Sequence, residues 1–190
     1  WLEANSLHKF PKVIPVSETN AVQYAISPSG AWLAFKTPTK LVLGENDPQN
    51  VKWQTLQESS ERSPLSIAFS PDNSHLATSN ADRHVLLWDL KQPSTSPLEL
   101  SQDAYVLDLL FNPDGSLLLG SDRGADHNSN LFLWDVKTGT LLRRWASKGY
   151  QFTFHPNSTK MAAVDYSNWK ITIYDLSTWQ PLQIMQGPQY

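Results

Sequence analysis

A chain of 190 residues, 40% of them hydrophobic, can bury the core of one domain of ordinary size. A formal net charge of −3 gives no sign of bulk-charge binding to nucleic acid or an anionic membrane, and the absence of cysteine excludes disulfide bonds and thiolate metal sites. Since no apolar run approaches the roughly 18–20 residues that span a bilayer and no signal peptide is visible, we expect no membrane segment and a cytoplasmic protein.

The first predicted element lies in residues 1–20. "WLEANSLHKF" aligns with "WDVKTGTLLRRW" further along the chain, with only the aspartate missing. We therefore expect residues 1–20 to hold the tail and outer strand of a preceding repeat unit. Because the chain starts with Trp1 rather than methionine, we also expect it to be a piece of a longer protein.

A strand–turn–strand pattern then occurs four times, as "YAISPSGAWLAF", "IAFSPDNSHLAT", "LLFNPDGSLLLG" and "FTFHPNSTKMAA". Its proline is preset for the second position of a tight turn. These prolines follow one another at intervals of 43, 42 and 43 residues: Pro28, Pro71, Pro113 and Pro156. Two-residue alternation and prolines inside each unit exclude helical repeats of this length.

The repeat predicts four short antiparallel strands in each of four units. The units are 21–56, 65–101, 105–145 and 149–185. The strands expected in them are 21–26, 32–36, 40–44 and 51–56; 65–69, 75–80, 84–88 and 97–101; 106–111, 117–122, 130–135 and 140–145; and 149–154, 160–165, 170–174 and 181–185. Four antiparallel strands repeated radially make a propeller blade, so the expected fold class is all-β.

The third strand of a unit ends with an aromatic residue and an acid in three of the four units. The first unit has Gly44 in the aromatic position and keeps the acid at Glu45. The three complete pairs are Trp88–Asp89, Trp134–Asp135 and Tyr174–Asp175.

These motifs resemble the WD-repeat (WD40-type) β-propellers over nearly all of residues 21–185. The resemblance implies about four blades of an open or partial propeller, with Trp88 and Trp134 wedged between sheets and the following aspartates capping turns. The acid expected between the second and third strands is clear only as Asp82, and the family's Gly-His pair is absent. The family's hydrogen-bonded His–Ser/Thr–Asp–Trp network therefore cannot be complete, and we expect blades held mainly by apolar packing.

The innermost strands carry a column of polar residues. Two interpretations stay open: a position near a water-lined central channel, or the more favoured hydrogen bond to a neighbouring blade. The column is Gln23, Ser66, Asp108 and Gln151.

No catalytic or metal-binding pattern is visible. The five histidines are spread along the chain without ligand spacing, and the acidic loop "SDRGADHNSN" does not match a calcium loop. There is no nucleophile elbow, phosphate-binding loop or dinucleotide fingerprint. We predict no enzyme, no catalytic or metal-ligating residue and no cofactor.

One loop is longer in the third unit than elsewhere. Proline and aromatic lie 17 residues apart in the second unit, 18 in the fourth and 21 in the third, where "DRGADHN" holds the extra residues. In the family that the chain resembles, this loop and the one entering the innermost strand share a face that commonly binds partners. Residue types that dominate interfaces are expected there. The candidate partner-binding residues are Arg62, Arg83, Arg123, His127, Tyr166 and Trp169.

The resemblance implies a non-enzymatic scaffold for protein–protein interaction, presenting one loop face to other proteins or peptides. The alternative is a propeller domain attached to a hydrolase or to a periplasmic translocation protein. Those blades share the Ser-Pro-Asp-Gly turn but typically lack the tryptophan that ends the third strand, so Trp88 and Trp134 favour the scaffold.

Four blades are not expected to close on themselves, because propellers of this family usually have about six to eight. We therefore expect open apolar faces on both end blades. Remaining blades of the parent chain are expected to cover them, in preference to a second copy.

Overall fold

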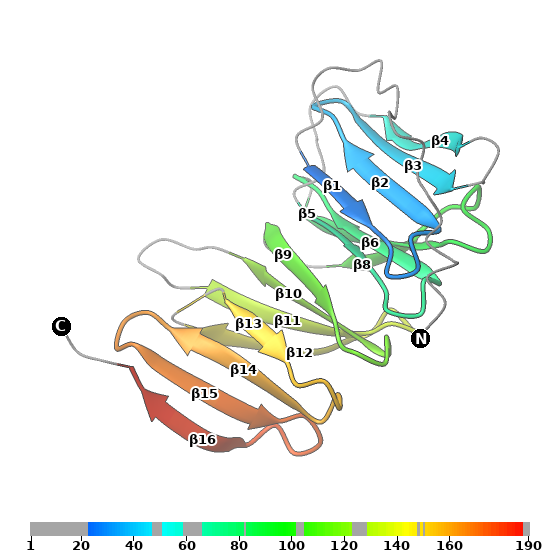
Figure 1. Ribbon diagram of the computed structural model, residues 1–190. Helices are drawn as coiled ribbons and strands as arrows, with labels where there is room; N and C mark the ends of the chain where they lie inside the picture. The colour runs from blue at the N-terminus through cyan, green and yellow to red at the C-terminus, as the bar shows by residue number, and fades with distance from the viewer. Residues whose placement is uncertain are drawn as a thin grey trace, which may run out of the picture.

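The computed structural model describes residues 23–46, 51–58, 66–81, 83–101, 105–122, 129–147, 149 and 151–187. Within these ranges the chain forms sixteen strands and no helix, so no described helix could cross a membrane. The strands make four antiparallel sheets of four strands each, and the strand order in each sheet follows the chain (Figure 1).

We number the four sheets as blades in chain order. Blade 1 contains β1 (Gln23–Ile26), β2 (Trp32–Lys36), β3 (Lys40–Asn46) and β4 (Val51–Glu58). Blade 2 contains β5 (Ser66–Phe69), β6 (His75–Ser79), β7 (His84–Asp89) and β8 (Leu98–Ser101). Blade 3 contains β9 (Val106–Phe111), β10 (Leu117–Asp122), β11 (Ser129–Asp135) and β12 (Leu141–Ser147). Blade 4 contains β13 (Phe152–Phe154), β14 (Lys160–Asp165), β15 (Lys170–Asp175) and β16 (Pro181–Gln186).

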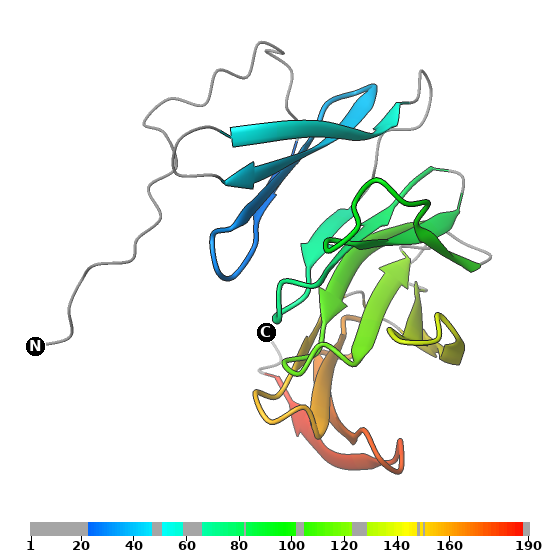
Figure 2. The ribbon, with the colours of Figure 1, turned by 90° about the vertical axis from the view of Figure 1, so that its right-hand side faces the viewer.

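The blades follow one another along an open arc rather than a closed ring. Blade 1 lies at one end and blade 4 at the other, as the two perpendicular views show (Figures 1 and 2). The predicted all-β, open propeller-like architecture with four-stranded antiparallel blades is therefore confirmed.

The first turn of every blade has the same geometry. In blade 2, Asn73 N–H donates to Ser70 O and Ser70 N–H to His75 O, while Ser70 Oγ accepts from His75 N–H. The residue that closes each tight turn has a positive φ, which favours glycine or asparagine. These residues are Gly30, Asn73, Gly115 and Ser158.

Neighbouring first turns touch along one side of the arc, which we call the turn face. Ser29 N–H donates to Asn73 Oδ1 at 2.8 Å, and Asp114 N–H donates to Ser158 Oγ at 3.1 Å. These bonds link blade 1 to blade 2 and blade 3 to blade 4. The sequence interval of 44 residues between the bonded partners reflects the repeat itself.

Each blade presents one side to the preceding blade and the other to the following blade. Between successive blades lies a buried apolar cluster, so the arc has three cores in series. In each cluster, aliphatic side chains from the following side of one blade meet the preceding side of the next. Residues that share a cluster in this way are Leu43 with Trp88, Leu87 with Trp134, and Leu133 with Met161.

The two tryptophans that end third strands are buried but differ in their polar contacts. Trp88 Nε1–H donates to Thr78 Oγ1 at 3.1 Å. Trp134 is fully buried, and its Nε1 has no hydrogen-bond partner. Its ring lies against Gly120, which occupies in blade 3 the register position that Thr78 occupies in blade 2. A side chain at position 120 would collide with the Trp134 indole. Blade 3 therefore has no hydroxyl group at the position where Thr78 accepts the tryptophan N–H in blade 2.

The end blades differ from each other. On the preceding side of blade 1, Leu33, Phe35 and Val42 are buried, so the expectation of an open apolar face is wrong there. Trp53 packs edge-on against Phe35 and helps to cover this side. On the following side of blade 4, Ile173 is only half-buried. That side borders two adjoining hollows of about 680 and 390 Å³.

Candidate partner-binding surface

The ends of the blades opposite the turn face form a second surface, which we call the loop face. It consists of the described turns between second and third strands, residues 37–39, 80–81 with 83, and 166–169, together with Tyr105 and Gly149 from the connections between blades. These turns lie at the left-hand ends of the sheets in Figure 1.

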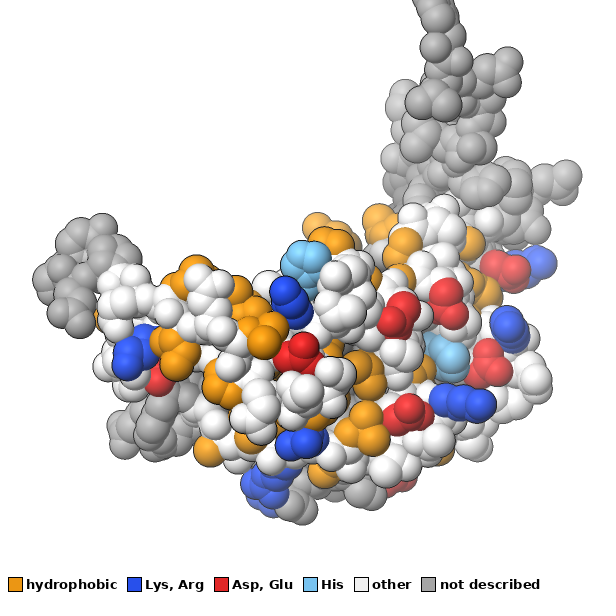
Figure 3. All heavy atoms as spheres, turned by 90° about the horizontal axis from the view of Figure 1, so that it is seen from below, with side chains coloured by type: hydrophobic (Ala, Val, Ile, Leu, Met, Phe, Trp, Pro, Cys, Tyr) orange, Lys and Arg blue, Asp and Glu red, His pale blue; other side chains and the backbone are white. Residues whose placement is uncertain are grey.

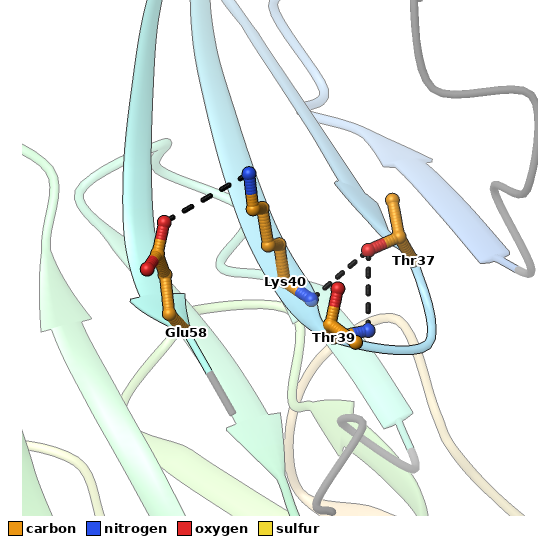
Figure 4. A network of polar contacts seen from close by, with 4 residues as sticks. All are labelled: Thr37, Thr39, Lys40 and Glu58. Atoms are coloured by element: carbon orange, nitrogen blue, oxygen red, sulfur yellow. Dashed lines mark hydrogen bonds and ion pairs between the residues drawn. The ribbon is translucent and has the colours of Figure 1, made fainter. Parts of the chain in front are cut away.

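In blade 1 the loop face is polar, and hydrogen bonds hold its turn in place. Thr37 Oγ1 accepts hydrogen bonds from the backbone N–H groups of Thr39 and Lys40, at 3.3 and 2.9 Å (Figure 4). Lys40 Nζ lies 3.8 Å from Glu58 Oε1 on the neighbouring strand. Lys36, the residue before Thr37, is buried, and burial lowers the pKa of its ammonium group.

Between blades 2 and 3, Arg83 and Tyr105 form a stacked pair. The Arg83 guanidinium carbon lies 5.3 Å from the centre of the Tyr105 ring, the geometry of a cation–π contact. Tyr105 itself is exposed. The pair joins the turn before β7 to the connection that enters β9, so it bridges two blades on the loop face.

In blade 4, Tyr166 and Trp169 form an edge-to-face pair with ring centres 5.9 Å apart and planes at 89°. Trp169 is 58% exposed, whereas Tyr166 is half-buried. The turn is held from the strand behind it, because Gly187 N–H donates to Trp169 O and Gln186 Nε2–H donates to Asn168 O. A large apolar ring is thus displayed on a fixed backbone.

Arg83 and Trp169 occupy the same place in their turns, immediately before the third strand. Both have a positive φ, 69° and 56°, which is unusual for long or bulky residues. Backbone strain of this kind costs about 1–3 kcal/mol and clusters at binding sites. Both side chains that the sequence singled out in these turns are therefore held in the same strained conformation.

The remaining candidates cannot be placed. Arg62, Arg123 and His127, together with the turn acid Asp82, lie outside the described residues. The base of the long loop in blade 3 is described: the Asp122 carboxylate accepts hydrogen bonds from the backbone and side-chain N–H groups of Asn130.

Sequence reasoning missed Tyr105. It lies in a connection between blades to which the repeat pattern assigns no strand or turn. Only its contact with Arg83 in the folded chain indicates that it belongs to the candidate surface. Of the predicted candidates, the structure brings Tyr166 and Trp169 together, whereas Arg83 contacts Tyr105, which the sequence did not single out.

The turn face carries carboxylates at the start of its turns, and also Trp179, which has a positive φ of 61° and lies under the Arg143 guanidinium. Asp89 Oδ1 accepts from Lys91 N–H, and Asp135 Oδ1 accepts from both Thr138 N–H and Thr138 Oγ1–H. The Thr138 hydroxyl and then its amide lower the pKa of Asp135. Asp175 accepts from the turn that follows it in the same way, first from the Ser177 hydroxyl, which lowers its pKa to about 2.

In the first turn of blade 2, Asp72 has the same role. Burial acts to raise the pKa of its carboxyl, but hydrogen bonds from Ser70 and Ser74 outweigh burial and lower the pKa to about 2. These acids act on their own turns: each carboxylate accepts hydrogen bonds from hydroxyl and amide donors within three residues of it. Within the described residues, no group of three or more histidine, aspartate or glutamate residues could hold a metal ion.

The residues of the polar column on the innermost strands differ in burial. Ser66 is buried, whereas Asp108 and Gln151 are exposed and border the larger hollow beside blade 4. At blades 3 and 4 the column therefore faces the open inside of the arc.

Comparison with known protein families identifies one repeat in the chain. Residues 52–89 match the family model of the WD40 repeat, described as "WD domain, G-beta repeat". The match runs from β4 of blade 1 to the end of β7 in blade 2. One sequence repeat thus supplies the outer strand of one blade and three strands of the next.

Two curated proteins are similar in sequence to parts of this chain. The chain is 32% identical over 94 residues to WD repeat-containing protein 1-B of Xenopus laevis, covering 50% of this chain and 15% of that protein. It is 27% identical over 111 residues to the transcriptional corepressor LEUNIG_HOMOLOG of Arabidopsis thaliana, covering 58% and 14%. The matched segments thus span about one seventh of these relatives.

Among solved structures, the fold is similar to Kuenenia stuttgartiensis hydrazine synthase, with a TM-score of 0.69 over 92% of this chain and 53% of that chain. The sequence identity is 15%, so the likeness concerns the fold alone.

Proposed function

We propose, from the premise that this chain carries a WD40 repeat in an open arc of four propeller blades, that it is a non-enzymatic scaffold whose loop face binds other proteins or peptides. WD-repeat proteins are generally protein-interaction scaffolds, which supports this class of function. The observation that carries the proposal is the exposed Trp169, displayed with Tyr166 on a strained, anchored turn.

A second pair strengthens the same surface. Arg83 and Tyr105 offer a planar cation stacked on an exposed ring, and arginine, tyrosine and tryptophan are the residue types that carry most binding energy at interfaces. On the turn face, the acids already accept hydrogen bonds from their own turns, and the ring of Trp179 is half-buried, whereas Trp169 and Tyr105 on the loop face are exposed. We therefore assign the partner to the loop face.

The competing class is a propeller attached to a hydrolase or a periplasmic translocation protein. Trp88 and Trp134, both buried between blades, support the WD-repeat class instead. The non-enzymatic assignment is also in keeping with the turn-capping use of the carboxylates on the turn face.

The open side of blade 4 supports a further part of the proposal: it receives another blade of the same repeat, supplied by the parent protein. Ala162, Ile171 and Ile173 stand in the register positions of Leu119, Leu131 and Leu133, which are buried where blade 3 meets blade 4. This side of blade 4 therefore has apolar residues at the same positions as the side of blade 3 that packs against blade 4, and a further blade could pack on it in the same way.

The loop-face assignment can be tested with a displayed library of random peptides selected on the 190-residue chain. We expect enriched peptides to bind Trp169→Ala and Tyr105→Ala at least about tenfold more weakly than the unmodified chain, since such side chains are typical hot spots. Lys137→Ala, on the turn face, is the matched control and should bind normally.

Equal binding of the enriched peptides to all four proteins would contradict the assignment. So would a selective loss in Lys137→Ala, because that result would place the partner on the turn face.

A further inference from the structure

Five serine or threonine residues of this chain stand directly before a proline: Ser27, Thr37, Ser63, Ser70 and Ser96. Ser63 lies outside the described residues. The structure separates the other four, because three of them are buried and Ser96 is exposed.

The three buried hydroxyl groups hold tight turns. Ser27 and Ser70 open the first turns of blades 1 and 2, and Thr37 opens the turn between β2 and β3. In each case the side-chain oxygen accepts a hydrogen bond from a backbone N–H group of the same turn. Ser27 and Thr37 are 2% exposed and Ser70 is 1% exposed. An enzyme could therefore reach these hydroxyl groups only after the local structure opens.

Ser96 lies in the connection between β7 and β8, residues 90–97. The equivalent connections of blades 3 and 4, residues 136–140 and 176–180, are three residues shorter. The longer connection is held at its middle, where Gln54 Nε2–H of β4 donates to Pro93 O at 3.1 Å. Blades 3 and 4 fold without these extra residues, so their sequence in blade 2 is free to serve another role.

Ser96 offers an accessible hydroxyl group, whose Oγ has no hydrogen-bond partner among the described residues. The neighbouring hydroxyl group is used by the connection itself, because Thr95 Oγ1–H donates to Gln92 O at 2.8 Å. Ser96 and Pro97 belong to neither a turn nor a strand, and a residue before proline is held in an extended conformation. Ser96 thus combines an exposed hydroxyl group with the extended backbone that a kinase cleft accepts.

We propose that Ser96 is a phosphorylation site for a protein kinase that requires proline after the acceptor residue. Ser96 Oγ attacks the γ-phosphorus of ATP, the bond from that phosphorus to the β–γ bridging oxygen breaks, and ADP leaves. The hydroxyl proton passes to the catalytic aspartate of the kinase. Pro97 favours this class of kinase because it has no backbone N–H, whereas another residue would leave an unpaired N–H in a cleft that offers no acceptor there.

The phosphate group would change the surface charge without breaking a turn. Lys91 is the only charged residue of the sequence 90–97. On the face of the molecule seen from below, basic and acidic side chains are interspersed rather than gathered into a patch of one sign (Figure 3). A phosphoserine carries about −1.5 to −2 charges at neutral pH, so it would be the largest local charge on such a surface.

The test uses the folded 190-residue chain, ATP and a proline-directed serine/threonine kinase, with the occupancy of each site followed by mass spectrometry. We expect Ser96 to be phosphorylated at least about tenfold faster than Ser70, because Ser70 reacts only after local opening. Pro97→Ala should slow the reaction at Ser96 by at least about tenfold, since it restores the backbone N–H. Ser94→Ala, an exposed serine of the same connection without a following proline, is the matched control and should leave the rate at Ser96 unchanged.

Synthetic peptides separate accessibility from sequence preference. Peptides that span Ser70 and Ser96 should be phosphorylated at similar rates, because neither hydroxyl group is buried in a short peptide. A Ser96 peptide that the kinase does not modify would overturn the proposal, as would a folded chain that stays unmodified at Ser96 while its peptide reacts. Equal rates at Ser96 and Ser70 in the folded chain, or an unchanged rate in Pro97→Ala, would overturn it too.

Discussion

The indole ring of Trp53 lies across the backbone of Gly44, so close that a β-carbon on Gly44 would sit 2.5 Å from Trp53 Cζ3. The two residues are directly paired, Gly44 on β3 and Trp53 on β4. Gly44 stands at the end of the third strand, where blades 2 and 3 have tryptophan. Blade 1 therefore has its aromatic ring on the same side, supplied by the adjacent strand and packed edge-on against Phe35.

Gly44→Ala should destabilise the protein by about 1–3 kcal/mol, because the added methyl group overpacks the space beneath Trp53. In a Trp53→Ala background the same substitution should be neutral or slightly stabilising, since alanine is favoured over glycine inside a strand. Denaturant unfolding of the four proteins in this double-mutant cycle measures the coupling. An equal cost of Gly44→Ala in both backgrounds would show that the two residues are independent.

Trp88→Ala and Trp134→Ala should each destabilise by about 3–5 kcal/mol, because each removes a large buried ring from a core between two blades. The unfolding midpoint in guanidinium measures the loss. Trp169→Ala, which truncates an exposed tryptophan, is the control and should leave the midpoint nearly unchanged. Wild-type midpoints for both buried variants would refute the wedge role.

Thr78→Val should cost about 1–3 kcal/mol, because it keeps the shape of the side chain but leaves the buried Trp88 N–H without its acceptor. Thr153→Val, on an exposed strand position, should change stability by less than about 0.5 kcal/mol. Thermal unfolding of both variants gives the comparison. A cost for Thr78→Val no larger than that of Thr153→Val would mean that the hydrogen bond contributes nothing net.

Acid should weaken the fold through the turn carboxylates. Asp72 and Asp175 have pKa values of about 2 in the folded chain, below their ordinary value of 3.8, so the unfolded chain binds more protons between these values. Their contribution is fully present above about pH 4–5 and is lost as the pH falls toward about 2. Melting temperatures measured across this window should fall, and Asp175→Asn should flatten the fall. An unchanged slope in that variant would contradict the assignment.

The open side of blade 4 should tolerate a charge that its counterpart in blade 3 cannot. Leu133→Asp places a carboxylate in a fully buried interface and should cost more than about 4 kcal/mol. Ile173→Asp, at the same register position of the half-buried end face, should leave the fold intact and reduce binding of an exposed-hydrophobe dye. If both variants unfolded alike, Ile173 would already lie in a closed interface.

The blades themselves could be predicted from the sequence. Two-residue alternation, the turn-forming prolines Pro28, Pro71, Pro113 and Pro156, and their near-constant interval are local signals, and local backbone preferences decide where strands begin and end. The predicted strands accordingly agree with the observed ones to within a few residues, as for β2 and β10. The resemblance to WD-repeat propellers follows from the same regularity.

Only the tertiary structure decided the contacts that cross strands and blades. Trp53 supplies the ring that Gly44 lacks, Thr78 accepts a hydrogen bond from Trp88, and Tyr105 stacks with Arg83. No local sequence pattern identifies these pairs. Such contacts depend on strand register, which shifts by a bulge between third and fourth strands in three of the four blades. Register depends on turn geometry and on which face of each strand is buried, and packing between whole sheets decides which faces are buried. For the same reason, only the assembled arc shows that Leu33 and Phe35 on the outer side of blade 1 are buried while Ile173 on the outer side of blade 4 is only half-buried.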